Sequence, residues 1–324
     1  MAICDEAFHY RQSDPARAEA IIREGLRRYP GDAILLNNLL YTMKSPEDDE
    51  EIIRICSTAS ELGIRKIRVT GGEPFVRIGC AGLIRSIKEI SGIDEVYVTT
   101  NGQSLSTYID ELAGAGIDGI NISMDTLVPE RFSSITGGGI LDRTLEAIGL
   151  SVKAGITTKV NTLIIKGFNE DEVTGLAAFA FDRGIALRFI EMMPVGAGDP
   201  SKGVPNSGIL ERLLAEWPDL EPDTAARGCG PAVYYSRPGV KGALGFISAM
   251  HEPFCRDCNR IRLTSQGQLK PCLCYEEGTD LRPYISGSDG ELKEALRQAI
   301  YHKPKAHCFA AAHPEHRLMS QIGG

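Results

Sequence analysis

The sequence lacks a long apolar run, an export signal and an excess of basic residues. No apolar run approaches the ~18 residues that a membrane-spanning helix needs, and residues 1–11 lack the order of a signal peptide. The 43 acidic residues outnumber the 35 basic ones and give a net charge of −8, which argues against nucleic acid or a membrane surface as partner. We therefore expect a cytoplasmic protein, in which a local group of Arg and Lys could still hold a small anion.

A disulfide framework is not expected either. The nine cysteines are odd in number and follow no export signal, unlike those of a disulfide-stapled secreted protein. Five are scattered and are interpreted as buried or idle thiols. The other four, Cys255, Cys258, Cys272 and Cys274, lie close together in the sequence, which indicates a metal site.

The cysteine spacing leaves two kinds of metal site open. Cys255 and Cys258 form a C-x-x-C pair, and the residues up to Cys272 look like a β-hairpin that turns at 266–267 and brings the third sulfur back. Three thiolates suit an iron–sulfur cluster with one open iron. Four thiolates, with Cys274 included, would suit a closed structural zinc site.

Two arginines lie between these cysteines. Arg260 and Arg262 alternate on a predicted strand and therefore face the same side. Two guanidinium groups that point together prefer phosphate or carboxylate, although a solvated basic face gives the same pattern.

From about residue 46 the sequence alternates between helical and strand patterns. The predicted strands, which are apolar and mostly β-branched, cover 64–72, 95–102, 119–126, 158–165 and 186–194. This order predicts right-handed βαβ units and a parallel sheet. Residues 195–245 are rich in Gly and Pro and predict loops around one helix near 209–216.

The carboxyl ends of the predicted strands should lie along one rim, which carries the functional site in parallel α/β barrels. The residues expected at this rim are Thr70, Thr99, Ser123, Asn161 and Glu191.

Residues 13–43 form a separate pattern of two short helices. Asp14 and Pro15 are typical of a helix start, and the A-x-x-x-x-G-L-x-x-x-P segment from Ala20 to Pro30 resembles one tetratricopeptide repeat. Because one repeat cannot bury its faces alone, an ordinary helical hairpin is the alternative. A repeat would give residues 1–45 a possible protein partner.

An ordered set of motifs gives the chain a more specific resemblance. TGGEP, VTTNG, INISMDT, KVNTLII and LRFIEMMP follow or contain successive strands, CRDCNRIR leads to a third cysteine fourteen residues after Cys258, and the sequence finishes with IGG. Together they resemble the GTP 3′,8-cyclases of molybdenum cofactor biosynthesis, which are radical S-adenosylmethionine (SAM) enzymes of the lyase class. The resemblance runs from about residue 46 or 60 to residue 324.

The resemblance implies an α/β fold with three parts. An incomplete parallel (β/α) barrel over 46–194 would hold SAM, a C-terminal iron–sulfur domain over 195–324 would bind GTP, and the helical hairpin would occupy 1–45. Cys255, Cys258 and Cys272 match the ligands of a [4Fe–4S] cluster whose open iron binds the guanine of GTP.

Other site residues are implied by the same resemblance. The positions that match GTP contacts are Arg68, Thr99, Lys159, Arg260, Ile261 and Arg262. Those that match SAM contacts are Gly72, Ser123 and Met193. Gly323 and Gly324 match a tail that supports catalysis by inserting into the active site.

One family motif does not occur in the sequence. The family holds its first [4Fe–4S] cluster in an N-terminal C-x-x-x-C-x-x-C loop, and this cluster supplies the electron that cleaves SAM to the radical that attacks C3′ of GTP. We therefore expect one cluster rather than two, and no cyclisation of GTP by this chain as written. The alternatives are a GTP- and iron–sulfur-binding protein without catalysis, and a helical-repeat interaction protein that carries the barrel. Whether residues 1–45 are a genuine fusion, and which oligomer forms, cannot be predicted from the sequence.

Overall fold

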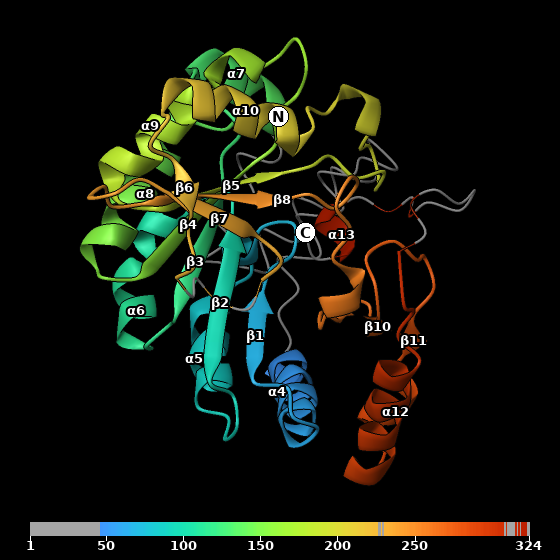
Figure 1. The fold of residues 1–324 in the computed structure, drawn as a ribbon. Helices are drawn as coiled ribbons and strands as arrows, with labels where there is room; N and C mark the ends of the chain where they lie inside the picture. Colours follow the sequence, from blue (N-terminus) through green and yellow to red (C-terminus); the bar gives the residue numbers. More distant parts are fainter. Residues whose placement is uncertain are drawn as a thin grey trace, which may run out of the picture.

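The computed structural model describes residues 46–225, 228, 230–307, 309, 315, 317 and 319–322. The hairpin predicted over 1–45 and the tail glycines Gly323 and Gly324 lie outside these residues. A large sheet with its helices stands beside a smaller C-terminal unit (Figure 1). Within the described part of the chain, no helix has the length and apolar character needed to cross a membrane.

The large sheet contains eight strands in the order β1-β2-β3-β4-β5-β8-β7-β6. Its first five strands are the predicted ones: β1 (Lys66–Val69), β2 (Glu95–Thr100), β3 (Gly119–Ser123), β4 (Thr157–Thr162) and β5 (Ala186–Ile190). They pair in parallel. As far as the structure describes the chain, β1 and β6 are the two edges, so the sheet is an open, incomplete barrel.

The prediction of loops over 195–245 is wrong in part. This segment contains α10 (Asn206–Glu216), β6 (Glu221–Pro222), β7 (Val233–Ser236) and the start of β8 (Ala243–Ile247). β8 pairs in parallel with β5, and β7 and β6 add antiparallel pairs. These strands are only two to five residues long and alternate with Gly- and Pro-rich turns, which obscures the strand pattern. The sheet therefore continues beyond Pro194.

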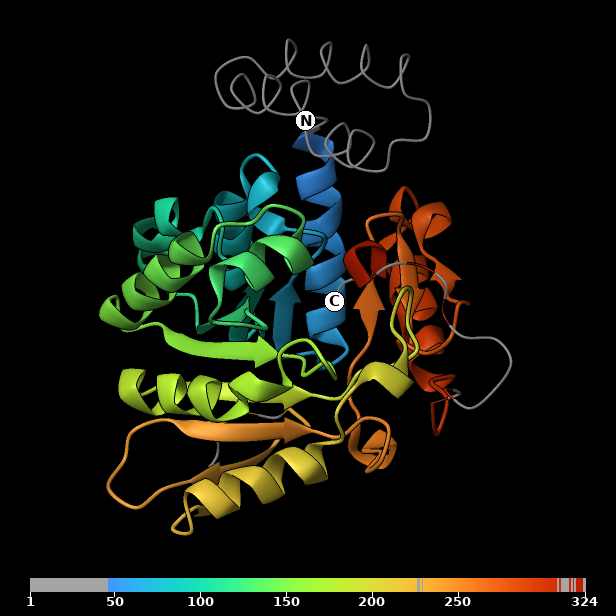
Figure 2. The same cartoon turned by 90° about the horizontal axis from the view of Figure 1, so that it is seen from above.

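Helices cover one face of this sheet (Figure 2). Five of them fill the predicted alternation of helix and strand: α4 (Pro46–Glu61), α5 (Cys80–Lys88), α6 (Ile109–Gly114), α8 (Leu141–Lys153) and α9 (Val173–Arg183). One more, α7 (Pro129–Thr136), was not predicted. It begins with Pro129 in its first turn and ends at Gly137, which has a φ of +70° that favours glycine.

Side chains of the sheet alternate between two faces, as the twofold period of a strand requires. The helix-covered face carries fully buried apolar residues in register across strands: Val98, Ile120, Ile122, Val160, Leu187 and Phe189. The opposite face, called the polar face below, carries Arg68, Thr99, Asn121, Lys159, Asn161 and Arg188. One face thus supplies the core, and the other supplies the side chains of a site.

The C-terminal unit contains a second, antiparallel sheet in the order β11-β10-β9. Its elements are β9 (Arg262–Leu263), β10 (Gln268–Lys270), β11 (Thr279–Asp280), α11 (Arg282–Ile285), α12 (Asp289–Tyr301) and α13 (Met319–Ile322). The predicted hairpin is confirmed, with its turn at Gly267, where φ is +76°.

The C-terminal unit packs against α4. Arg54 Nε donates to Asp289 Oδ1 at 2.9 Å, and Lys293 Nζ donates to Glu61 Oε2 at 2.8 Å. A small apolar cluster lies beneath these bonds, in which Ile55 of α4 meets residues of the second sheet and α12, such as Leu292. This contact fixes the cysteine-bearing hairpin relative to the polar face.

Candidate nucleotide and metal site

Six cations come together between the polar face and the hairpin, and they are called the cationic cluster below. They are Lys66, Arg68, Lys159, Arg188, Arg260 and Arg262. Burial, followed by the positive charges of Arg260 and Arg68, lowers the pKa of Arg262 to about 10. Burial also lowers the pKa of Arg188, and Arg260 contributes to that shift. Arg262 thus lies within electrostatic reach of Arg260 and of Arg68 on β1, and Arg188 on β5 lies within reach of Arg260.

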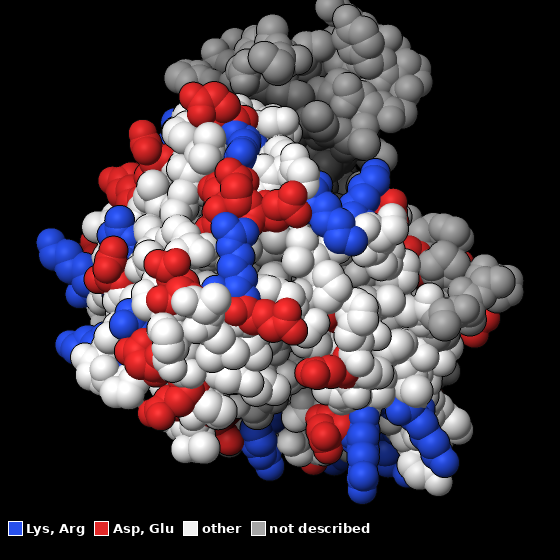
Figure 3. Space-filling model, turned by 45° about the horizontal axis from the view of Figure 1, so that its top comes forward, with Lys and Arg blue, Asp and Glu red and all other residues white. Residues whose placement is uncertain are grey.

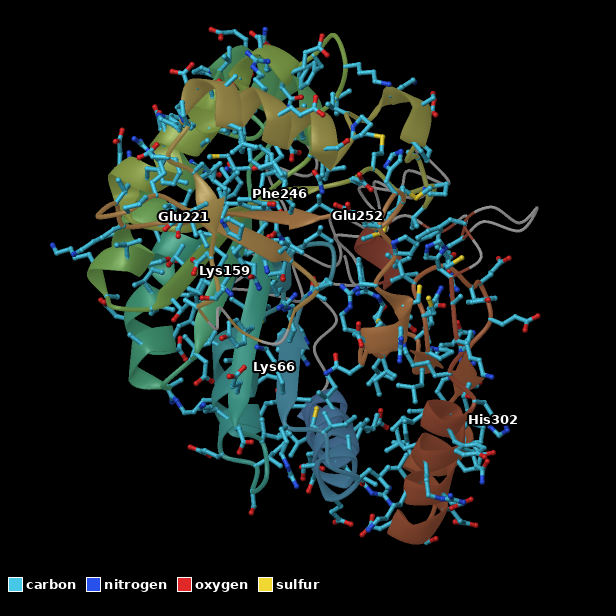
Figure 4. All side chains as sticks on the ribbon, in the orientation of Figure 1. Lys66, Lys159, Glu221, Phe246, Glu252 and His302 are labelled. Carbon is cyan, nitrogen blue, oxygen red and sulfur yellow. The ribbon has the colours of Figure 1, made fainter. Side chains whose placement is uncertain are left out.

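The two lysines of the cationic cluster approach the same stretch of backbone. A Cβ placed on Gly228 would lie 3.6 Å from Lys159 Nζ and 3.9 Å from Lys66 Nζ. Aromatic rings support both ammonium groups, with Lys66 Nζ 4.0 Å from the Tyr97 ring centre and Lys159 Nζ 5.8 Å from that of Tyr234. Figure 4 labels Lys159 over the sheet and Lys66 on the edge strand β1.

Arg188 is held in one orientation by two asparagines of the polar face. Its Nη2 donates to Asn121 Oδ1 at 2.6 Å, and its Nε donates to Asn161 Oδ1 at 2.8 Å. The side chain is buried, and both partners come from neighbouring strands. A guanidinium fixed in this way is preorganised for an anion.

Such a group of like charges is suited to a polyanion. Bringing cations together raises the free energy of the folded chain, and a bound anion relieves that cost. Acidic and basic side chains are interspersed on the face shown in Figure 3, so the cationic cluster differs from that surface. A triphosphate matches its charge and its span over several elements.

The structure brings most of the predicted GTP contacts together. Arg68 and Arg260 both act on the charge of Arg262, Thr99 pairs in register with Asn121 on the polar face, and Ile261 is half-buried against the small apolar cluster. Lys159 lies on β4 beside them in register.

Sequence reasoning missed two members of the cationic cluster. Lys66 lies two residues before Arg68, so strand alternation alone could have placed it on the same face. Arg188 lies inside the apolar run of β5, and only its register pairing with Asn161 shows which face it takes.

The three predicted SAM contacts lie at the carboxyl ends of different parallel strands. Gly72 follows β1 and is exposed, Ser123 ends β3 and is exposed, and Met193 follows β5 and is half-buried. They therefore share the rim that the strand pattern predicted.

Two buried carboxylates brace this rim. Glu73 accepts from Thr100 Oγ1 and Asn101 N at 2.7 Å each. Glu191 accepts from Met250 N at 2.9 Å and from His251 Nδ1 at 2.9 Å. Glu73 thus joins the end of β2 to the loop after β1, and Glu191 joins the end of β5 to that of β8.

The loop after β5 also contacts the C-terminal segment of the chain. Gly198 is required in this loop because a Cβ there would lie 2.1 Å from Met193 O. Gly196 N donates to Glu315 O at 2.9 Å. The buried Glu315 side chain pairs with Lys270 of β10 and with Arg317, so the loop, the hairpin and the C-terminal segment are tied together.

Cys255, Cys258 and Cys272 are half-buried free thiols around the hairpin. Partial burial opposes ionisation of Cys258, but the backbone and guanidinium of Arg260 outweigh it and hold the pKa of this thiol below its ordinary value. Cys255 Sγ accepts from His307 N at 3.3 Å. Within the described part of the chain, no group of three or more His, Cys, Asp or Glu side chains is arranged to hold a metal ion.

The charges around these thiols would favour the thiolate form that iron–sulfur ligands take. Cys258 and Cys272 both act on the charge of Arg262, so cations that would compensate a cluster lie beside two of the thiols. Free thiols with a backbone N–H donor and nearby cations are the surroundings that thiolate ligands need.

Cys274 does not provide a fourth thiolate. It is fully buried and disulfide-bonded, a single bond where no disulfide framework was expected. The four-cysteine zinc site therefore loses one ligand. Of the scattered cysteines, Cys56 and Cys80 are buried free thiols as predicted, and burial raises their pKa values to about 11 and about 12.

Comparisons with known proteins define the class of this fold and site. The model of the radical SAM superfamily matches residues 41–180, and that of Molybdenum Cofactor Synthesis C matches residues 185–309. The chain is therefore a radical SAM protein with the C-terminal domain of molybdenum cofactor synthesis.

Curated relatives define the family within that class. The GTP 3′,8-cyclase of Clostridium perfringens (strain SM101 / Type A) is 43% identical over 279 residues, which cover 85% of this chain and 86% of that protein. Those of Pelotomaculum thermopropionicum and Geobacter sulfurreducens are each 40% identical over 281 residues, with the same coverage. The chain belongs to the GTP 3′,8-cyclase family, which confirms the resemblance found in its motifs. This is an enzyme family of molybdenum cofactor biosynthesis, and radical SAM membership implies SAM and a [4Fe–4S] cluster.

Proposed function

We propose that this chain binds GTP, with the triphosphate in the cationic cluster and the guanine at a metal held by Cys255, Cys258 and Cys272. The cationic cluster is the observation that carries the proposal. It gathers six cations from four strands and one loop in a chain of net charge −8. Lys66 already pairs with Glu95, and a bound polyanion would repay the cost of bringing the other cations together.

Each of the proposed GTP contacts has a different role. Lys66 and Lys159 both reach toward one stretch of backbone, while Arg188 is held in place by its asparagines. Arg260 and Arg262 follow Cys258 directly and would link the phosphates to the metal side. Thr99 offers a hydroxyl on the same face.

The rim would hold SAM through Gly72, Ser123 and Met193. The loop of Met193 contacts Glu315 through Gly196, so the C-terminal segment approaches this side of the site. That contact is consistent with the role expected of Gly323 and Gly324, a tail that supports catalysis near the substrates.

A [4Fe–4S] cluster at the three cysteines would supply an open iron for the guanine. The sequence as given contains no C-x-x-x-C-x-x-C loop to hold a second cluster. We therefore predict that this chain holds one cluster and does not by itself cleave SAM or cyclise GTP. This is the alternative of GTP and iron–sulfur binding without catalysis.

Anaerobic reconstitution with iron and sulfide tests both parts. We expect about four irons per chain and no 5′-deoxyadenosine when SAM and GTP are added. About eight irons together with 5′-deoxyadenosine formed over multiple turnovers would refute the single-cluster prediction. One zinc without sulfide would refute the iron–sulfur assignment.

A pair of cysteine variants locates the metal. Cys272→Ala should lose the iron, whereas Cys80→Ala, which removes a buried free thiol away from the hairpin, should keep it. Full iron retention in Cys272→Ala would show that the third ligand is another residue.

A further inference from the structure

Tyr234 of β7 lies over the polar face because the neighbouring strand carries a glycine there. Tyr234 pairs in register with Gly245 of β8, and Gly245 pairs in turn with Arg188 of β5. A Cβ on Gly245 would lie 2.7 Å from Cε1 of the Tyr234 ring and 3.0 Å from Cγ of Arg188. The space above the glycine is therefore filled by these two side chains, and a methyl group does not fit there.

The side chain of Tyr234 contacts two members of the cationic cluster. Lys159 Nζ lies 5.8 Å from the ring centre, within the range of a cation–π interaction. Burial lowers the pKa of Arg188, and the hydroxyl of Tyr234, which is hydrogen-bonded to this guanidinium, opposes that shift. Because a guanidinium only donates, the hydroxyl oxygen is the acceptor. Tyr234 thus favours the charged form of Arg188 and lies against Lys159 at the same time.

The acceptors around Arg188 come from three strands. Asn121 of β3 accepts from Nη2, Asn161 of β4 accepts from Nε, and Tyr234 of β7 adds its hydroxyl oxygen. A guanidinium has five N–H donors, so this side chain can be fixed by the protein and still donate to phosphate oxygens. The asparagines hold it from one side of the sheet and Tyr234 holds it from the other, since β7 and β4 lie on opposite sides of β5.

The next residue, Tyr235, takes the opposite face of β7. It pairs in register with Leu244 and packs against the large apolar core. Its ring meets that of Phe246 edge-on, with the ring centres 5.6 Å apart. Two adjacent tyrosines therefore differ in their surroundings, one lying against cations of the polar face and the other against apolar side chains.

We propose that Tyr234 is a positioning residue of the nucleotide site, which holds Arg188 and Lys159 in the arrangement that binds the phosphates of GTP. The inference rests on the proposed function. Arginine and lysine side chains lose conformational freedom when they bind a ligand, and prior fixation by a neighbour reduces that cost. Tyr234 acts through the two cations and needs no contact of its own with the nucleotide.

Four variants of the anaerobically reconstituted chain test this role. Tyr234→Phe removes the hydroxyl and keeps the ring, and Tyr234→Leu removes both. Gly245→Ala keeps Tyr234 and Arg188 but places a methyl group where they meet. Tyr235→Phe is the matched control, because it removes a hydroxyl from the other face of the same strand. The measurements are the equilibrium affinities for GTP, inorganic triphosphate and guanosine.

The expected losses concern the phosphates alone. Tyr234→Phe should weaken GTP and inorganic triphosphate roughly 3- to 10-fold, because it removes a hydrogen bond to a charged group. Tyr234→Leu should weaken both by about a further threefold, since the cation–π contact is lost as well. Gly245→Ala should also weaken both. Guanosine should bind all variants as it binds the unmutated chain, and Tyr235→Phe should bind all three compounds like the unmutated chain.

Two results would overturn the inference and leave the proposed function intact. Tyr234→Phe with unchanged affinity for GTP and inorganic triphosphate would show that the hydroxyl positions nothing. Equal losses for GTP and guanosine would show that Tyr234 supports only the packing of the sheet. If the unmutated chain bound GTP no more tightly than guanosine, the proposed function itself would be refuted, and the inference with it.

A label that keeps both the ring and the hydroxyl covers the case in which a variant fails to fold. With 3-fluorotyrosine in place of Tyr234, the ¹⁹F resonance should shift when inorganic triphosphate is added, because the cations against the ring then bind an anion. The same label in place of Tyr235 should not respond. A resonance at Tyr234 that is unchanged by saturating triphosphate would contradict the inference.

Discussion

The two faces of the large sheet use the same strands for opposite purposes. On the helix-covered face, Ile122, Val160 and Leu187 follow one another in register with no exposed surface. One residue along each strand, the polar face carries Asn121, Lys159 and Arg188. Within each strand, residues on the helix-covered face contribute to stability and the alternating residues on the polar face are available for ligand binding. A single substitution should therefore affect one of these properties and leave the other unchanged.

The largest effect is expected on the helix-covered face. Phe189 of β5 is fully buried and stacks on Phe246, with the ring centres 5.6 Å apart. Phe189→Ala removes this packing and leaves a cavity, so the free energy of unfolding should fall by about 3–5 kcal/mol. Chemical denaturation measures this change.

Thr99→Ala provides the control on the polar face. Thr99 is half-buried and lies outside the apolar core, so its loss should cost less than about 1 kcal/mol of unfolding free energy. Equal losses for the two variants would contradict the division between the faces.

A smaller effect, on binding, is expected from Arg262→Met. Charge-assisted hydrogen bonds contribute about 1.5–3 kcal/mol, so the affinity for GTP should fall roughly 10- to 100-fold. Burial and neighbouring cations disfavour the charge of Arg262 and lower its pKa to about 10. The lowered pKa means that folding disfavours the charged form of Arg262. Replacing it with the neutral Met should therefore leave the free energy of unfolding unchanged or raise it.

Arg282→Met is the matched control for that variant. Arg282 belongs to the same C-terminal unit but is exposed and pairs with Asp280, away from the cationic cluster. Its loss should leave GTP affinity unchanged. If Arg262→Met reduced stability without reducing affinity, Arg262 would belong to the core rather than to the site.

Much of this division could be predicted from the sequence. The five β-branched runs predicted β1 to β5, and the C-x-x-C pair with Gly267 predicted the hairpin. Both depend on local features, namely the alternation of side chains along a strand and the residues that form a turn. The rim residues followed from the rule that carboxyl ends of parallel strands lie together. Arg260 and Arg262 were placed beside the cysteines by sequence proximity alone.

Other features depend on partners far away in the sequence and could not be predicted. β8 is five residues long and becomes recognisable as a strand only through its pairing with β5. Arg188 looks like an interruption of an apolar strand until register sets it beside Asn161. The contact of His307 with Cys255 joins residues 52 positions apart, and no local pattern marks it.

Equilibrium binding of GTP, GMP and guanosine to the anaerobically reconstituted chain tests the central claim most directly. If the cationic cluster binds the triphosphate, GTP should bind most tightly and guanosine most weakly, and the difference should shrink as salt is added because salt screens charge interactions. Equal affinities for the three compounds at low salt would contradict the assignment of the polar face to GTP.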